Sequence, residues 1–309
     1  MNNNYSSRIH TVIHYIEKNI TQPMSLDMLA DISHFSKYHF SRIFTSMMGV
    51  TPIAFVHQKR LQQSIVYLRE TDHTILEISS LCGFESISSY NAIFKKHYNR
   101  TPSVVRKDLK LNKYSNIPLQ SSNMVEEISN PLRYYEGNNS SFLRRVWNMN
   151  VEIKELPDYE VAYVRHIGSY LETRGAWSML GSWAELNRVT PREQFFIGIS
   201  IDDPGVVEEY ACRYDACVTL PEGFNHQQAK HAEISYKRLS GGLYALFPFY
   251  DTIDKLAITY QSLFGQWLPN SEYDADDRYC LEFCMNNPLD DPEGKCKIDL
   301  YIPIKRGSL

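Results

Sequence analysis

An internal repeat in the first hundred residues constrains this chain more than any other feature. When the sequence is shifted by 50 residues, two segments of similar chemistry superpose. The matches are Leu26-Asp27-Met28 on Leu76-Glu77-Ile78, Ser36 on Ser86, Phe40 on Tyr90, Ile43-Phe44 on Ile93-Phe94, Gly49 on Asn99, and Thr51-Pro52 on Thr101-Pro102. Agreement at so many positions indicates that one supersecondary unit occurs twice.

The first copy predicts two helices joined by a tight turn. Ser25 and Ser36 are suitable N-caps, because their hydroxyls can accept from backbone N–H groups of a first turn. The residues after Ser36 carry apolar side chains at the i, i+3, i+4, i+7 spacing of one helix face, namely Phe40, Ile43, Phe44 and Met47. Gly49 can take the positive φ that ends a helix. The copy therefore predicts a helix on each side of His34-Phe35.

The second copy repeats these signals. Thr74 and Glu77 predict a capping box, Gly83 supplies the turn, and Ser86 caps the next helix. Asn99 replaces Gly49, and Asn is the other residue that tolerates positive φ. Residues 52–70 between the copies read as one long helix, and residues 8–19 read as an opening helix. Residues 6–110 are thus expected to form an all-α domain with two helix-turn-helix motifs.

A helix-turn-helix unit can place its second helix in the major groove of double-stranded DNA. Residues 1–110 carry 13 Lys/Arg and 8 Asp/Glu, a net of +5, whereas residues 111–309 carry 19 and 28, a net of −9. A basic segment favours a polyanion partner, although any small helical domain has solvated polar faces. Because one chain holds two such helices, we expect a monomer to bind an asymmetric site.

Residues 6–110 resemble the DNA-binding domain of the AraC/XylS regulators. The motifs that carry the resemblance include Leu26-Asp27-Met28-Leu29-Ala30, Ser36-Lys37-Tyr38-His39-Phe40-Ser41-Arg42-Ile43-Phe44, Gly49-Val50-Thr51-Pro52, Cys82-Gly83-Phe84 and Phe94-Lys95-Lys96. The resemblance implies transcription regulation, with activation through a contact with RNA polymerase.

The same resemblance implies which side chains read DNA. They are Tyr38, Ser41 and Arg42 in the first recognition helix and Ser88, Ser89, Asn91 and Lys95 in the second. Arg42 is the best candidate for a guanine contact. Ala92 stands where several relatives carry arginine, so the second helix is expected to read its half-site less strictly.

The remainder of the chain divides into a tether and an α+β domain. Residues 111–149 are rich in Asn and Ser and read as a linker, with short apolar groups at 132–135 and 142–147. Residues 150–309 show strand patterns interrupted by helical segments at 173–186 and 253–267. A weak repeat at a shift near 83 predicts two strand-helix-strand-strand units, which would form a curved antiparallel sheet with a groove between its halves.

Residues 150–306 resemble GyrI-like effector-binding domains. The matching segments include Tyr163-Val164-Arg165-His166-Ile167-Gly168-Ser169-Tyr170, Ile197-Gly198-Ile199, Gly241-Gly242-Leu243-Tyr244-Ala245, Leu281-Glu282 and Asp299-Leu300-Tyr301-Ile302-Pro303-Ile304. The resemblance implies a small lipophilic or cationic effector and places Glu282 in the ligand cleft. The expected effector residues are Tyr163, Tyr170, Trp183, Phe247 and Glu282. Residues 247–251 depart from the family's turn, so that side of the cleft is expected to be reshaped or partly filled.

Other classes of function find little support in the residues. No long uncharged apolar run predicts a membrane span, and the N-terminus lacks the features of a signal peptide, so a cytoplasmic protein is expected. None of the six Cys forms a CxxC pair, which predicts reduced thiols and no metal site. The nucleotide-binding and hydrolase motifs GxxxxGK, GxGxxG, GxSxG and HExxH are also absent, so no cofactor and no enzyme activity are expected.

Two alternatives remain for residues 150–309. The domain could bind a protein or serve only as a structural element, or Glu282 with a neighbouring Tyr or Trp could act as an acid–base pair in a small-molecule hydrolase.

Overall fold

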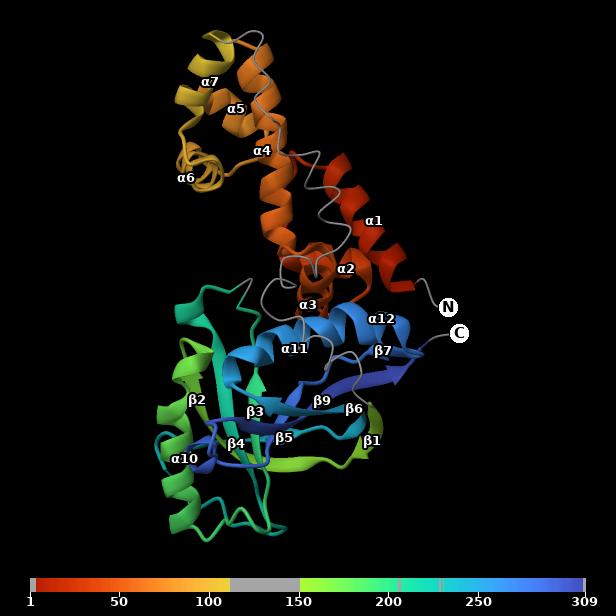
Figure 1. The fold of residues 1–309 in the computed structure, drawn as a ribbon, viewed down its shortest axis with the longest axis vertical. Helices are drawn as coiled ribbons and strands as arrows, with labels where there is room; N and C mark the ends of the chain where they lie inside the picture. The colour runs from red at the N-terminus through yellow and green to blue at the C-terminus, as the bar shows by residue number, and fades with distance from the viewer. Residues whose placement is uncertain (1–3, 112–150, 205–206, 228, 230, 308–309) are drawn as a thin grey trace. The chain divides into compact units, whose positions relative to one another are not determined.

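The computed structural model describes residues 4–111, 151–204, 207–227, 229 and 231–307 (Figure 1). The chain divides into two compact units, one of residues 3–135 and one built mainly of residues 136–309, and each is described here by itself. The predicted linker at 111–149 lies outside the described residues except for Leu111.

In the described part of the first unit, residues 4–111, the regular elements are all helices, as the repeat predicts. Its helices are α1 (Asn4–Lys18), α2 (Leu26–Ser33), α3 (Lys37–Met48), α4 (Pro52–Glu70), α5 (Ile75–Leu81), α6 (Ile87–Tyr98) and α7 (Pro102–Leu111). The opening helix begins four residues earlier than expected. The α2–α3 and α5–α6 pairs are the two helix-turn-helix motifs, and α4 connects them (Figure 1).

The capping residues of both copies act as the sequence predicts. The side chain of Ser36 accepts from the backbone N–H of His39, and that of Ser86 accepts from Ser89. Thr74 and Glu77 form the complete capping box at α5. Gly49 ends α3 at φ 71°, and Asn99 ends α6 at φ 57°. Because caps satisfy the backbone groups left open at helix ends, these residues determine where each helix begins and stops.

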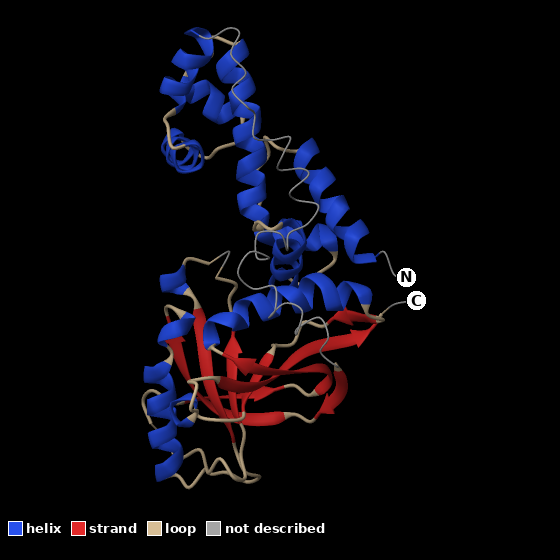
Figure 2. Ribbon diagram, viewed as in Figure 1, coloured by secondary structure: helices blue, strands red, loops and turns tan. Residues whose placement is uncertain are grey.

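Within the described residues, nine strands of the second unit form one sheet (Figure 2). They are β1 (Glu152–Leu156), β2 (Tyr159–Ile167), β3 (Phe196–Ser200), β4 (Arg213–Thr219), β5 (Ser235–Leu239), β6 (Gly242–Asp251), β7 (Tyr273–Ala275), β8 (Leu281–Cys284) and β9 (Cys296–Arg306). Their order is β1-β6-β9-β8-β3-β4-β2-β5, with β7 paired to β9, and every pair is antiparallel.

The strand order contains the repeat that the sequence predicts weakly. Strands β2, β4 and β3 on one side correspond to β6, β9 and β8 on the other, and β3 pairs with β8 where the halves meet. The first strand of each half pairs with a strand of the other half: β1 pairs with β6, and β5 pairs with β2. The two halves of the second unit therefore form a single continuous sheet.

The second unit also contains the two helical segments that the sequence predicts. Helix α10 (Arg174–Leu186) agrees with its predicted range. The helix predicted at 253–267 consists of several segments. A 3₁₀ turn (Ile253–Lys255) precedes α11 (Leu256–Ser262), and a π-helical turn (Leu263–Trp267) and α12 (Leu268–Asn270) follow α11. Further 3₁₀ turns span Tyr170–Glu172, Glu209–Ala211 and Pro288–Asp290.

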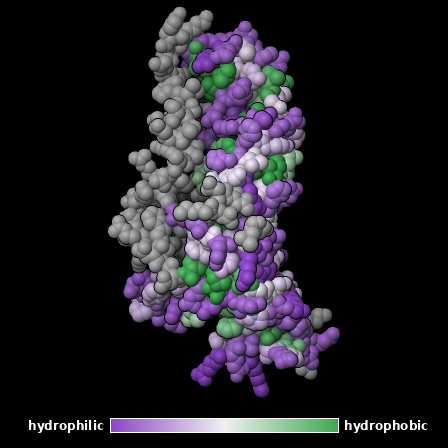
Figure 3. All heavy atoms as spheres, turned by 90° about the vertical axis from the view of Figure 1, so that its right-hand side faces the viewer, coloured by the Kyte–Doolittle hydropathy of each residue, from purple (hydrophilic) through white to green (hydrophobic). Residues whose placement is uncertain are grey.

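Apolar side chains cover both faces of the sheet. On one face Val164 and Ala216 pack with Leu180 and Trp183 of α10, and on the other Val161, Ile197 and Phe283 form a second cluster. On the molecular face drawn in Figure 3, hydrophilic side chains predominate and hydrophobic ones form small separate patches. The side chains named on both faces of the sheet are themselves buried.

Candidate DNA interface and candidate effector site

Helix α3 carries the three reading residues expected in the first motif. Its N-terminus is held by Ser36, whose Oγ lies 2.8 Å from Nδ1 of His39. The guanidinium carbon of Arg42 lies 4.3 Å from the centre of the Tyr38 ring, in cation–π range. Tyr38, Ser41 and Arg42 thus span little more than one turn of α3.

Helix α6 presents its expected reading residues differently. Ser88 and Lys95 are exposed, and Ser89 and Asn91 are half-buried. Ser88, Asn91 and Lys95 follow the i, i+3, i+7 spacing of one helix face, opposite the buried Tyr90 and Phe94. The last turn is basic, with Lys95, Lys96 and His97. This face combines short polar side chains with cations, which suits base-edge and phosphate contacts.

The candidate effector residue Glu282 lies at the centre of the sheet, where the two halves join. It is on β8, opposite Gly198 of β3, and only 2% of its surface is exposed. Ser200 Oγ and the Tyr260 hydroxyl donate to its Oε1 at 2.8 Å and 3.0 Å, and the Tyr214 hydroxyl donates to Oε2 at 3.3 Å. A carboxylate has acceptor sites enough for these three O–H donors.

Burial and the nearby Glu282 carboxylate raise the pKa of Tyr214 well above its usual value. Tyr214 therefore keeps its proton at physiological pH and remains a donor. Gly198 makes room for this arrangement, because a β-carbon there would collide with the Tyr214 hydroxyl and lie 2.8 Å from Oε2 of Glu282. The site thus depends on a residue with no side chain.

Two of the other expected effector residues lie near this cluster. Phe247 shares the row of Glu282 across the sheet, since both residues are paired with Leu300. Its ring is 5.1 Å from that of Trp267, in a T-shaped arrangement, and it is fully buried. The Tyr170 ring lies 5.8 Å from the Tyr214 ring. Residues 247–251, where the sequence departs from the family's turn, form the end of β6, and Phe247 packs there against Trp267.

Trp183 and Tyr163 are placed elsewhere. Trp183 donates from Nε1 to the Ala229 carbonyl and packs on Phe224 and Tyr236, as part of the core beneath α10. Tyr163 pairs with Cys217, which pairs with Ile197, in the row next to that of Glu282. Because successive strand residues point to opposite faces, Tyr163 faces away from Glu282.

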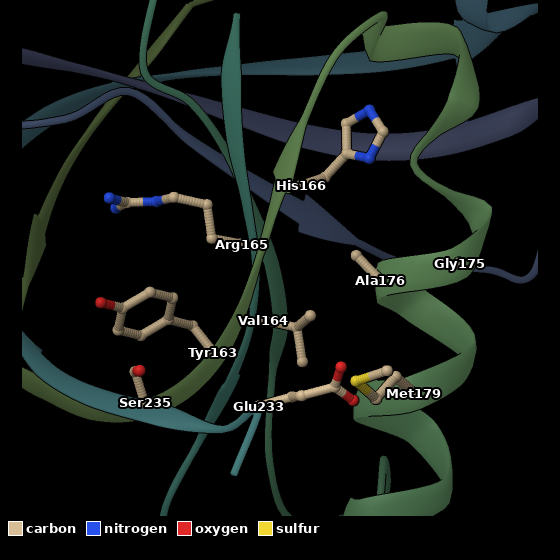
Figure 4. Close-up of a pocket in the computed structure, with 9 residues that line it drawn as sticks. All are labelled: Tyr163, Val164, Arg165, His166, Gly175, Ala176, Met179, Glu233 and Ser235. Atoms are coloured by element: carbon tan, nitrogen blue, oxygen red, sulfur yellow. The ribbon is translucent and has the colours of Figure 1, made fainter. Parts of the chain in front are cut away.

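A pocket of about 520 Å³ lies beside Tyr163, between β2 and α10 (Figure 4). Its lining includes Tyr163, Val164, Arg165, His166, Gly175, Ala176, Met179, Glu233 and Ser235. Figure 4 shows Tyr163 and Arg165 on one side of β2 and Val164 on the other, toward α10. Arg165 is engaged by Asp215, at 2.7 Å and 2.8 Å, and Lys237 also contacts Asp215. The pocket does not include Glu282.

Sequence reasoning missed Ser200, Tyr214, Tyr260 and Gly198 as members of the Glu282 site. Tyr214 and Ser200 could have been found from the register of β3 and β4, because they are directly opposite each other. Tyr260 comes from a helix distant in sequence, and no local pattern relates it to Glu282.

The described residues contain no group of three or more His, Cys, Asp or Glu side chains that could hold a metal ion. Among the same residues, no helix combines the length and apolar character needed to cross a membrane.

Comparisons with known proteins relate both units to families. Residues 149–305 match the GyrI-like small molecule binding domain, and residues 29–108 match a helix-turn-helix domain. The chain is 33% identical to the regulatory protein SoxS of Salmonella typhimurium over 98 residues, which are 32% of this chain and 92% of SoxS.

One longer relative matches over about a third of its length, and one solved domain matches over nearly all of its length. The transcriptional regulator Rob of Salmonella typhimurium is 33% identical over 99 residues, which are 32% of this chain and 34% of Rob. The C-terminal domain of EcmrR is 14% identical, with a TM-score of 0.43, and the match covers 52% of this chain and 99% of that domain. The chain therefore belongs to the AraC/XylS family of DNA-binding transcriptional regulators and carries a C-terminal domain of the GyrI-like family.

Proposed function

We propose that this regulator binds DNA as a monomer, with α3 and α6 in two successive major-groove segments. The observation that carries the proposal is the duplicated motif, in which the same caps position two recognition helices in one chain. Helix-turn-helix proteins with one motif per chain usually dimerise to obtain two such helices. The proposed DNA-contacting side chains, at base-contacting or adjacent positions, are Tyr38, Ser41 and Arg42 of α3 and Ser88, Ser89, Asn91 and Lys95 of α6.

Selection from a random duplex pool tests this proposal. The chain is expected to enrich one asymmetric sequence with two blocks of base preference about one helical turn apart. Affinity for that sequence is expected to fall steeply with salt, because phosphate contacts release counterions. Failure to enrich any sequence, together with a flat salt dependence, would contradict the proposal.

The proposal extends to activation of transcription through a contact with RNA polymerase, in the cytoplasm, as the family resemblance implies. Run-off transcription from a promoter that carries the enriched site measures it directly. The expected result is more transcript when the regulator is added. A decrease would instead indicate repression.

We further propose that a small lipophilic cation binds at Glu282 and modulates the regulator. The support is a carboxylate buried beside hydroxyl and aromatic groups, which is the chemistry that recognises organic cations. Because Glu282 is 2% exposed, the ligand has to displace neighbouring side chains, and the Tyr214 and Tyr260 hydroxyls are the groups that it would replace. No catalytic step is part of this proposal.

The effector proposal is tested by titrating the full chain with tetraphenylphosphonium and with the neutral triphenylphosphine oxide. Glu282→Gln is expected to weaken binding of the cation by about tenfold or more and to leave the neutral compound nearly unaffected, because only the charge is lost. Glu185→Gln, on the exposed side of α10, is the matched control. Equal losses for both compounds would contradict a cation site.

One observation favours the alternative that this domain binds a protein or is structural. The Glu282 carboxylate already accepts three hydroxyl groups, and Phe247 with Trp267 occupies part of the same face. On this alternative, a panel of lipophilic cations produces no thermal shift, and Glu282→Gln changes only stability. Turnover of a bound compound that is abolished by Glu282→Gln would instead support a hydrolase.

A further inference from the structure

The second helix-turn-helix motif contacts the loop that precedes the first motif, away from the helices that read DNA. The contact joins the α1–α2 loop, residues 19–25, to the α5–α6 turn at Gly83 and Phe84, with Arg60 of α4 beside both. We call these residues the inter-motif clasp. None of them is among the proposed base-contacting residues.

Arg60 connects both sides of the clasp. It stands near the middle of α4, and only 6% of its surface is exposed. Its Nε donates to the Ile20 carbonyl at 2.9 Å, and a terminal guanidinium nitrogen donates to the Gln22 carbonyl at 2.7 Å. Its guanidinium carbon also lies 5.9 Å from the centre of the Phe84 ring. One side chain therefore bonds twice to the loop before the first motif and also lies beside the Phe84 ring of the second motif.

Gly83 brings the two backbones into close approach. Its φ is +78°, and a β-carbon at this position would lie 2.8 Å from both the Ile20 and Thr21 carbonyl oxygens. The turn of the second motif thus packs against the loop that precedes the first motif, with no side chain between the two backbones. Rotation of one motif against the other would break the Arg60 hydrogen bonds and open this contact.

From this geometry we infer that Arg60 is a positioning residue that sets the spacing and orientation of α3 relative to α6. The inference rests on the proposed binding of one chain to two groove segments. An inserted base pair moves one half-site by about 3.4 Å and rotates it by roughly 35° relative to the other. A rigid clasp prevents α6 from following that movement, so the regulator discriminates between operator spacings through a residue that does not touch DNA.

The test uses the full-length chain and its enriched site, with one base pair inserted or deleted between the two blocks. The unaltered chain is expected to bind the altered sites at least about tenfold more weakly, since the contacts of one helix are lost. Arg60→Met keeps the apolar stem but removes the donors. Its spacing penalty is expected to fall below about threefold, whatever its overall affinity.

Lys59→Met is the matched control, because the neighbouring Lys59 binds Glu17 of α1 at 2.7 Å and has no part in the clasp. It should keep the full spacing penalty. Arg60→Lys retains the charge but not the fork of donors, and an intermediate penalty is expected. If circular dichroism shows that Arg60→Met is unfolded, the spacing penalty of Arg60→Lys tests the inference instead.

An unchanged spacing penalty in the folded Arg60 variant would overturn the inference, because Arg60 would then contribute only stability. An equally reduced penalty in Lys59→Met would also overturn it, since loss of a cation would explain the effect. A chain without substitutions that shows no spacing penalty would contradict the proposed two-segment binding itself.

Discussion

Helices α3 and α6 arise from the same repeated signals, yet they differ in what they offer to DNA. Each begins after a serine N-cap, buries an aromatic face and ends at a residue with positive φ. Helix α3 has Arg42 where α6 has Ala92, and it has no basic residue in its last turn, where α6 has Lys95 and Lys96. The comparison shows that caps and apolar spacing determine the fold, while the remaining positions can diverge.

These differences predict that α3 and α6 have different roles in DNA binding. An arginine can donate two hydrogen bonds to a guanine edge, whereas lysines near a helix end act mainly as point charges toward phosphates. We therefore expect α3 to supply most of the base discrimination and α6 to supply affinity with weaker discrimination. The predictions below test this difference, beginning with the largest expected effect.

Replacement of Arg42 by alanine should remove the strongest base contact. Affinity for the enriched site is expected to fall by about tenfold to a hundredfold, and preference at one base position should be lost. Arg69→Ala is the control, because Arg69 pairs with Glu70 at 2.7 Å in the last turn of α4. Competition binding against random duplex measures both effects, and an equal loss on random DNA would assign Arg42 to phosphate binding.

The converse substitution, Ala92→Arg, should make α6 more like α3. Ala92 is exposed, so a longer side chain can be accommodated without repacking the core. A new guanine preference of about tenfold is expected in the weaker block of the site. Repeating the selection with this variant reveals it, and a gain that is the same at every sequence would show added charge alone.

Lys95→Ala is expected to weaken binding uniformly across sequences. If Lys95 contacts a phosphate, the slope of log affinity against log salt should become shallower by about one. Titrations at four salt concentrations on the enriched site and on random duplex measure this slope. A loss confined to one base position would instead make Lys95 a base-reading residue.

The smallest effects concern the C-terminal caps. Gly49→Ala should lower the free energy of unfolding of the helical unit by about 1 kcal/mol, because alanine is strained at φ 71°. Asn99→Gly should raise it by a few tenths of a kcal/mol, because glycine accepts φ 57° more readily than asparagine. Urea unfolding followed by far-UV circular dichroism measures both. If both substitutions changed the free energy of unfolding by similar amounts in the same direction, positive φ would not constrain Gly49 and Asn99 in the same way.

The fold of the helical unit was largely predictable from sequence because its helices are bounded by local chemistry. Ser36, Gly49 and Ser86 signal helix ends through their own side chains or their lack of one. The inter-motif clasp was not predictable, because Arg60 bonds to carbonyls 38 to 40 residues away. Nothing near Arg60 in the sequence distinguishes it from other basic residues on a helix.

The candidate effector site was predictable only in part. Glu282 stands out as a carboxylate within an apolar strand, and the structure places it at the junction of the halves. Tyr163 was assigned to the same cleft, but β2 is buried on both faces, as Val161 and Ala162 show, so no alternation of polar residues revealed which way it points. Tyr260 reaches Glu282 from a different helix, which only the tertiary packing establishes.

The most direct test of the account is the mass of the protein–DNA complex on the enriched site, combined with the base preference at each position. The account predicts one chain per site and two blocks of preference about one helical turn apart, with strict discrimination in the block read by α3 and weak discrimination in the other. Two chains bound to a palindromic site would contradict it, because each chain would then use a single recognition helix.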